Sequence, residues 1–402
     1  MSDKRTATAP SKLPPTVVGL GVVSLFTDLS SEAIFPLLPA FLSSLGASNA
    51  FIGAVEGAAD LVANVLKYLS GLAADRRARL KPMVLAGYGL STLVRPLVAL
   101  AAAPWHVLLV RVGDRVGKGV RTSPRDALIA GVTDPSIRAR AFGFHRAMDH
   151  AGAALGTIFA SFLLWILGAG AGGASPGLMR TVFMWAAVPG FIAMVALALT
   201  PEPPRPVAVS KGVGKTKLPA ALKRALIPVM LFAFSNATDA FLLVKAVKLG
   251  APAVLAPMLW LTLHLVKAST ATFGGRLADR YGRRNALILG WLVYAVTWGS
   301  VGFADSIVVL FIMTAVYGVS HGLVEGAEKA LIAELAGDTA RGRAFGMYNM
   351  CVGFAALVAS ITFGAVWDRW GSVPAFAGSA LFAVLAAVTL YLLVPAPHRT
   401  AR

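Results

Sequence analysis

The feature that most constrains this chain is a succession of apolar runs, each about as long as a lipid bilayer is thick. A spanning helix needs about 20 mostly apolar residues, and turn residues divide the 402-residue sequence into twelve such runs. The predicted helices cover residues 15–43, 51–74, 82–102, 106–132, 139–167, 179–199, 223–247, 252–277, 285–304, 306–335, 341–367 and 372–395. The sequence therefore predicts an all-α membrane protein with twelve transmembrane helices.

The composition supports a membrane protein over a soluble one. Only 14% of the residues are charged and 57% are hydrophobic, whereas soluble domains carry about 25% charged residues. The single cysteine, Cys351, excludes an intrachain disulfide, and the histidines are poorly spaced for chelation, so we expect neither a metal site nor a cofactor. The first apolar run is longer than a signal-peptide core and lacks a cleavage site, which predicts a retained first helix.

The charges in the connections predict the orientation of the helices. Alternate connections are almost free of charge, as in 44–50, 102–106, 167–178 and 249–253. The intervening connections carry Arg76, Arg77, Arg79 and Lys81; Arg138 and Arg140; Arg205, Lys211, Lys215, Lys217, Lys223 and Arg224; Arg280, Arg283 and Arg284; and Arg341 and Arg343. Cytoplasmic loops carry the excess of Lys and Arg, so both termini are predicted in the cytoplasm. Much of the net charge of +18 is therefore an orientation signal and not a sign of nucleic-acid binding.

The two halves of the chain resemble each other. DALIAGVTDPSIRARAFG (126–143) aligns without a gap with KALIAELAGDTARGRAFG (329–346), 203 residues later. The predicted organisation is a cytoplasmic tail (1–14), a six-helix bundle (15–199), a polar Pro-rich linker (200–222), a second six-helix bundle (223–396) and a short tail (397–402). Duplicated bundles with a binding site between them are typical of transporters.

Two further segments carry a family resemblance. GLAADRRAR (71–79) and GRLADRYGRR (275–284) resemble the Gly-x-x-x-Asp-Arg signature of the major facilitator superfamily, and the resemblance covers nearly the whole chain. It implies two bundles that rock about a central site, driven by an ion gradient, with the first, fourth, seventh and tenth helices lining the cavity. It also implies a gating role for the residues of the signature, which are Gly71, Asp75, Arg76, Gly275, Asp279 and Arg280. The alternative is that these charges only set topology.

The first helix carries two carboxyl groups within the apolar run. Asp28 and Glu32 lie one turn apart on the same face. Burial disfavours a charged carboxylate, and two carboxylates that share a site resist ionising together. One of this pair is therefore a candidate for proton coupling; the alternative is an ion pair with a basic residue of helix 106–132.

That helix carries a row of cations. Arg111, Arg115, Lys118 and Arg125 follow spacings of 4, 3 and 7, with Arg121 beside them. Charged residues inside a membrane are costly, so each is a functional hypothesis. Arg115-x-x-Lys118-Gly119 resembles the Arg-x-x-Gln-Gly motif that the family associates with proton coupling, with Lys in place of Gln. The deeper Arg111 and Arg115 are expected to need a partner or a substrate, whereas Arg121 and Arg125 are expected to be end-of-helix charges.

The other intramembrane charges complete the candidate site. The substrate-cavity candidates beyond Arg111 and Lys118 are Arg146, Asp149, Asp239, Lys245, His264 and Lys267. His321 and Glu325 share one face of helix 306–335 and resemble the His/Glu coupling pair of sugar–proton symporters. A structural hydrogen bond is the alternative for that pair.

These residues favour a transporter over an enzyme, for which no catalytic constellation is present. The preferred function is proton-coupled transport of a small polar, anionic solute across a bacterial inner membrane by a monomer. The alternative is proton-driven efflux of drugs or natural products, although Thr157 stands where such antiporters carry a proline. A nutrient sensor is a third class, but no signalling domain is present.

Overall fold

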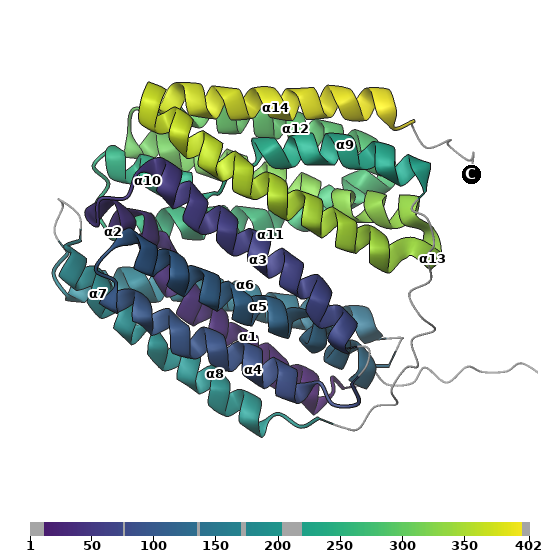
Figure 1. The fold of residues 1–402 in the computed structure, drawn as a ribbon, viewed down its shortest axis with the longest axis horizontal. Coiled ribbons are helices and arrows are strands. Elements are labelled where there is room, and N and C mark those ends of the chain that lie inside the picture. The colour runs from purple at the N-terminus through teal and green to yellow at the C-terminus, as the bar shows by residue number, and fades with distance from the viewer. Residues whose placement is uncertain (1–11, 75–76, 135–136, 170–173, 203–218, 396–402) are drawn as a thin grey trace, which may run out of the picture.

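The computed structural model describes residues 12–74, 77–134, 137–169, 174–202 and 219–395, with side chains left out at 138–139, 272, 279 and 337–343. All regular elements in this part of the chain are helices. Figure 1 shows the first half of the chain as one bundle and the second half as another beside it. The predicted helical class is therefore confirmed.

The first half begins at Pro15, a residue that suits the first turn of a helix because its missing N–H would be unpaired there. Its elements are α1 (Pro15–Ile34), η1 (Phe35–Leu37), α2 (Leu38–Ser44), α3 (Asn49–Ala74), α4 (Lys81–Val94), η2 (Arg95–Leu100), α5 (Pro104–Val132), α6 (Arg138–Ile166), α7 (Pro176–Trp185) and α8 (Ala187–Leu199).

The second half repeats this order with fewer interruptions. Its elements are α9 (Ala220–Ser235), α10 (Ala240–Lys248), α11 (Leu255–Tyr281), α12 (Arg283–Val301), α13 (Ile307–Trp370) and α14 (Ser372–Leu393). Glycines in the left-handed region separate the helices at two tight turns, Gly282 (φ 87°) and Gly371 (φ 89°), because side-chain-bearing residues rarely adopt this conformation.

Nine helical segments of the described residues are long and apolar enough to cross a membrane. The remaining predicted spans correspond to α5, α11 and α12, so the described helices are consistent with twelve spans. Large apolar side chains on the outside, such as Leu199 (79% exposed) and Val296 (73% exposed), suit contact with lipid.

Four predicted helices are interrupted: 82–102 becomes α4 and η2, 179–199 becomes α7 and α8, and the other two breaks bear on the site. The prediction 15–43 becomes α1, η1 and α2, because Pro36 and Pro39 cannot donate backbone hydrogen bonds within a helix. The prediction 223–247 becomes α9 and α10, with Asn236–Asp239 between them. Thr238 N in this gap donates to Ser360 Oγ at 3.1 Å, and Ser235 O accepts from Tyr294 Oη at 2.8 Å, so neighbouring helices satisfy backbone groups that the break releases.

The predictions 306–335 and 341–367 fall in the single helix α13, which contains two candidate spans, Ile307–Ala336 and Ala344–Trp370. Gly318 and Gly322 meet Val266 and Thr270 of α11, so the first span runs parallel to α11. Gly346 meets Tyr68 and Gly364 meets Asn49, so the second span runs antiparallel to α3. The two spans therefore point in opposite directions.

Equivalent positions of the two halves form equivalent contacts. Gly119 of α5 lies against Leu66 of α3, and Gly322, 203 residues later, lies against Thr270 of α11. Gly87 of α4 lies against Arg121, and Gly290 of α12 lies against Val324, again at a separation of 203. The duplication in the sequence is thus a duplication in the packing.

We call the end of the molecule where α1, α4, α9 and α12 begin the linker end, and the opposite end, with α2, α7 and α10, the distal end (Figure 1). Toward the distal end, one apolar core joins the halves and includes Phe41 and Phe241. Toward the linker end, each half has a further core of its own, around Tyr88 and around Ile332. The halves also meet nearer that end, where Gly346 of α13 lies against Tyr68 of α3.

Candidate transport site between the two halves

A buried ionic network occupies the interior of the first half. Arg111 of α5 contacts both oxygens of Glu56 of α3, at 3.0 Å (Nε–Oε1) and 2.5 Å (Nη2–Oε2). Asp114 accepts from Arg95 Nε at 2.9 Å and lies 4.0 Å from Arg111 Nη1. Arg95 also donates to Thr27 O at 3.0 Å. These charges satisfy one another, as buried charges must, so Arg111 belongs to the interior of the bundle and not to an open cavity.

The predicted row of cations on α5 is therefore split. Arg121 is 4% exposed; it donates to Ser91 Oγ at 2.8 Å and lies over the Tyr88 ring. The expectation that it is an end-of-helix charge is thus wrong, because the neighbouring α4 offers a polar and aromatic pocket. Arg125 pairs with Asp126 at 2.9 Å.

Arg115 and Lys118 have no carboxylate within ion-pair distance in the described part of the chain, where the ion pairs of α5 involve Arg111, Asp114 and Arg125. The Nε of Arg115 is buried without a hydrogen-bond partner. Lys67 of α3 lies within electrostatic range of both cations, and its Nζ donates to Asn64 Oδ1 at 3.2 Å. We call Lys67, Arg115 and Lys118 the cationic cluster. It makes no ion pair in the described residues, although Asp28 and Asp60 lie within electrostatic range of it.

The two carboxyl groups of α1 have different surroundings. Glu32 Oε2 accepts from Trp260 Nε1 of α11 at 2.7 Å, a bond that crosses between the halves. Asp28 makes no ion pair in the described residues, and its charged neighbours are Asp149, Lys118 and Glu32. The alternative of an ion pair with α5 is therefore not seen for either carboxyl group.

Helix α6 places a third carboxylate next to these two. Asp149 accepts a short hydrogen bond from Ser24 of α1 and lies 3.5 Å from His145. Arg146 lies 3.8 Å from Asp149 and, across the halves, 3.7 Å from Glu325 of α13. Arg146 thus contacts a carboxylate within α6 and another in the second half.

A compact polar cluster lies in the second half at the break between α9 and α10. Asp239 accepts from Lys267 Nζ at 2.7 Å and from Tyr317 Oη at 2.6 Å. His321 Nε2 lies 2.8 Å from the same Tyr317 oxygen. His321 is therefore bonded to Tyr317, whereas Glu325 pairs with Lys329 at 2.9 Å. The two residues of the predicted His/Glu pair thus bond to other residues and not to each other.

A cavity of about 170 Å³ adjoins this cluster. It is bordered by Asn236, Tyr294, His321, Glu325, Glu328, Lys329 and Tyr348, together with apolar residues of α9 and α13. His264, whose Nε2 is buried without a partner, lies on α11 with its ring against Trp260. Polar groups from α9, α11 and α13 thus gather toward the interface of the halves.

One predicted cavity residue lies elsewhere. Lys245 is 8% exposed at the distal end of α10, where its Nζ donates to Gly302 O at 2.9 Å and Ser372 Oγ at 3.2 Å. It ties α10 to the neighbouring connections and does not reach the polar clusters. Lys245 lies on α10, beyond the break that separates α10 from α9. The sequence pattern does not reveal this break.

The signature residues lie at the linker end. Asp75 and Arg76 are outside the described residues, as is the side chain of Asp279. Gly71 has only Ser123 within van der Waals range, Gly275 has open space around it, and Arg280 lies over the Tyr281 ring. The two glycines are thus free of tight packing in this state.

Four residues important to the architecture were not predicted. Arg95 completes the ionic network, Trp260 bonds Glu32, Tyr317 bonds Asp239, and Asp368 accepts from the backbone N of Asn49 (3.1 Å) and of Ala50 (2.9 Å). Arg95 was detectable as a lone cation in an apolar run. Asp368 caps α3 from the other half of the chain, a contact that no local pattern signals.

Comparison with known proteins supports the same assignment. The model of the Major Facilitator Superfamily matches residues 20–264 and 249–402. An uncharacterized MFS-type transporter of Methanocaldococcus jannaschii is 30% identical over 395 residues, which cover 95% of this chain and 96% of that protein. A multidrug resistance protein of Proteus mirabilis is 24% identical, covering 86% of this chain and 85% of that protein.

Solved structures show the same fold. A nucleoside transporter structure has a TM-score of 0.79 at 15% identity, covering 94% of this chain and 100% of that one. A bacterial homologue of the lysosomal transporter Spinster, in an inward-facing and occupied conformation, has a TM-score of 0.76 at 17% identity, covering 94% and 96%. The chain therefore belongs to the Major Facilitator Superfamily and is a multi-pass membrane transporter, not an enzyme.

Proposed function

We propose that this chain is a secondary active transporter that couples the movement of a small polar, anionic solute to protons by alternating access. The observation that carries the proposal is the cationic cluster of Lys67, Arg115 and Lys118, which makes no ion pair in the described residues. Asp28, Asp60 and Asp114 act on it only at longer range. Charge without a contacting partner inside a membrane protein is costly. A carboxylate or phosphate of the solute would supply that partner.

The carboxyl groups of α1 support proton coupling. Asp28 makes no ion pair in the part of the chain that the structure describes, so protonation there would break no salt bridge. Glu32 accepts the indole N–H of Trp260 at 2.7 Å. A charge-assisted hydrogen bond weakens when its acceptor is neutralised, so protonation of Glu32 would loosen a contact between the halves.

The packing supports alternating access. The halves share one apolar core toward the distal end and have separate cores toward the linker end. The basic connections put the linker end in the cytoplasm, which is where we place both termini. In this assignment the signature residues Asp75, Arg76, Asp279 and Arg280 belong to the cytoplasmic side, where they would gate access to the space between the halves. We place the protein as a monomer in the bacterial inner membrane.

Proteoliposomes with an entrapped pH-sensitive dye test coupling. A panel of carboxylate and phosphate metabolites is added outside, and we expect at least one to cause a proton flux that requires the protein. Asp28→Asn or Glu32→Gln should abolish the flux while retaining solute binding, and Lys118→Gln should weaken binding. Solute movement that ignores the pH gradient in all variants would refute coupling.

Proton-driven drug efflux is a second candidate, supported by the similarity to the multidrug resistance protein over most of the chain. Overexpression should then lower susceptibility to several unrelated antibiotics. A strain whose susceptibility is unchanged, together with anion-dependent proton flux, would exclude efflux of those drugs as the function.

A further inference from the structure

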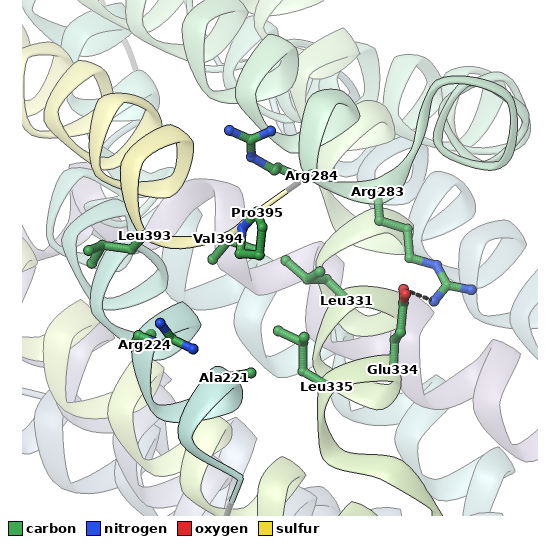
Figure 2. Close-up of a pocket in the computed structure, with 10 residues that line it drawn as sticks. All are labelled: Ala221, Arg224, Arg283, Arg284, Leu331, Glu334, Leu335, Leu393, Val394 and Pro395. Carbon is green, nitrogen blue, oxygen red and sulfur yellow. Dashed lines mark hydrogen bonds and ion pairs between the residues drawn. The ribbon is translucent and has the colours of Figure 1, made fainter. Parts of the chain in front are cut away.

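A second cavity lies at the linker end of the second half, away from the interface of the halves. It has a volume of about 280 Å³ and lies between the starts of α9 and α12, the end of α14 and the middle of α13. Figure 2 shows its lining, which consists of Ala221, Arg224, Arg283, Arg284, Leu331, Glu334, Leu335, Leu393, Val394 and Pro395. The lining thus combines three arginines and one carboxylate with an apolar wall.

The first half contains the counterpart of this place, and a carboxylate fills it. Glu202 Oε1 accepts from the backbone N of Leu80 at 2.5 Å and of Lys81 at 2.9 Å, where α4 begins. The first N–H groups of a helix have no partner within the helix and favour an anion. Lys81 Nζ in turn donates to Ala198 O (2.8 Å) and Thr200 O (2.6 Å) at the end of α8.

The correspondence of the two places rests on packing and on sequence. The contacts of Gly87 and Gly290 fix a separation of 203 residues, so Leu80 and Lys81 correspond to Arg283 and Arg284. After the last helix of each half, Leu-Thr-Pro-Glu (199–202) corresponds to Leu-Val-Pro-Ala (393–396). The sequence of the second half therefore replaces the Glu202 carboxylate by a methyl group at position 396, which is outside the described residues.

Arg284 keeps the role of Lys81 in part. Its Nη2 donates to Tyr391 O at 2.6 Å, near the end of α14, as Lys81 does at the end of α8. The residue is 8% exposed, and its Nε is buried without a partner. The N-cap residue of α12 is Gly282, which has no side chain to cap the helix. Among the described residues, the second half thus retains the cation and the helix start, and no carboxylate takes the place of Glu202 at the start of α12.

The remaining charges leave the cavity positive. Arg283 is paired with Glu334 and also donates to Ala330 O at 3.3 Å. Arg224, in the first turn of α9, is exposed and has no ion pair in the described residues. Figure 2 shows the Arg283–Glu334 pair and Arg224 at different sides of the leucine-lined space. One arginine is neutralised, and Arg224 and Arg284 are not.

We propose that this cavity binds the phosphate group of an anionic phospholipid, in the place that the Glu202 carboxylate occupies in the first half. Guanidinium groups match phosphate geometry, and basic pockets between helices at a membrane surface hold anionic headgroups. A volume of about 280 Å³ exceeds what a lone carboxylate needs, and Leu331, Leu335 and Leu393 offer a surface for the carbon part of the lipid.

Native mass spectrometry of the purified full-length protein in a neutral detergent tests this site. We expect phosphatidylglycerol to be retained and phosphatidylcholine to be released at the same concentration. Arg224→Gln should lower the affinity for phosphatidylglycerol about fivefold, the effect of one cation near a membrane surface. Lys223→Gln is the matched control, because it removes an equal charge from the start of α9 without lining the cavity; it should lower the affinity clearly less than Arg224→Gln does.

Inorganic phosphate separates the two sources of the phosphate group. Competition at millimolar concentration would support a site for a soluble phosphate group, whereas retention of phosphatidylglycerol despite inorganic phosphate would support the lipid. Equal retention of the two lipids, or equal losses in Arg224→Gln and Lys223→Gln, would overturn the proposal. The reciprocal variant Glu202→Ala should create a second phosphatidylglycerol site in the first half; the absence of any additional lipid would refute the correspondence with Glu202.

Discussion

The two halves share a backbone plan but distribute their charges differently. In the first half, the helix α5 carries Arg111, Asp114 and Arg115, and a buried ionic network holds part of this charge. In the second half, the equivalent positions of α13 are Thr314, Tyr317 and Gly318, and the ionised groups lie around Asp239 instead. The duplicated packing thus tolerates exchange of these three residues, which lets the two walls of one site acquire different chemistry.

The largest difference in stability between equivalent substitutions in the two halves is expected at positions 114 and 317. Asp114→Asn leaves Arg95, which is 6% exposed, without its carboxylate partner. Removing one partner of a buried pair costs about 3–5 kcal/mol. Tyr317→Phe removes one neutral donor to Asp239 and should cost about 1–3 kcal/mol. Thermal unfolding of the purified variants measures both, and equal losses would show that the two halves bury charge in the same way.

The glycines that bring equivalent helices together should respond alike. A methyl group at Gly119 would meet Leu66 Cβ at 2.5 Å, and one at Gly322 would overlap Thr270. Overpacking of this kind costs about 1–3 kcal/mol, so Gly119→Ala and Gly322→Ala should both lower the unfolding temperature. Gly275→Ala is the control, because among the described residues outside its own helical turn no atom lies within 4 Å of the added methyl group. A stable Gly322→Ala beside an unstable Gly119→Ala would show that the two interfaces have diverged in packing as well as in charge.

The distal contact between the halves should be weakened by removing the cap of α3. Asp368→Ala removes the acceptor for the N–H groups of Asn49 and Ala50, and loss of a helix cap costs about 0.5–2 kcal/mol. We expect a cysteine placed at Ser48 to react faster with a thiol reagent in this variant. Ser44→Ala is the control, because the Ser44 hydroxyl donates to Phe41 O within the same half. Equal labelling rates in the two variants would show that Asp368 does not hold the halves together at the distal end.

The exposed contact between the halves should matter least for stability. Arg146 and Glu325 are 3.7 Å apart, with side chains 59% and 61% exposed. Exposed pairs contribute about 0–1 kcal/mol, so Arg146→Gln should shift the unfolding temperature only slightly. A large loss of stability would mean that this pair holds the halves together in the described state.

The helical membrane class, the two equivalent halves and the family could all be predicted from the amino-acid sequence. These properties follow from local apolarity, from a repeat in register and from a short motif, none of which requires knowledge of contacts. The same reasoning located most of the intramembrane charges, because burial makes any charge conspicuous in an apolar run.

The pairing of those charges could be seen only in the tertiary structure. Arg111 and Arg115 are one turn apart in the sequence, yet Glu56 and Asp114 neutralise the first and leave the second without an ion pair in the described residues. Lys245 lies outside the candidate site because its Nζ is held by Gly302 O and Ser372 Oγ at the distal end of α10. Ion pairing depends on distances of a few ångströms between helices that are far apart in the chain, and a periodic pattern specifies a face of a helix but not the helix that it meets.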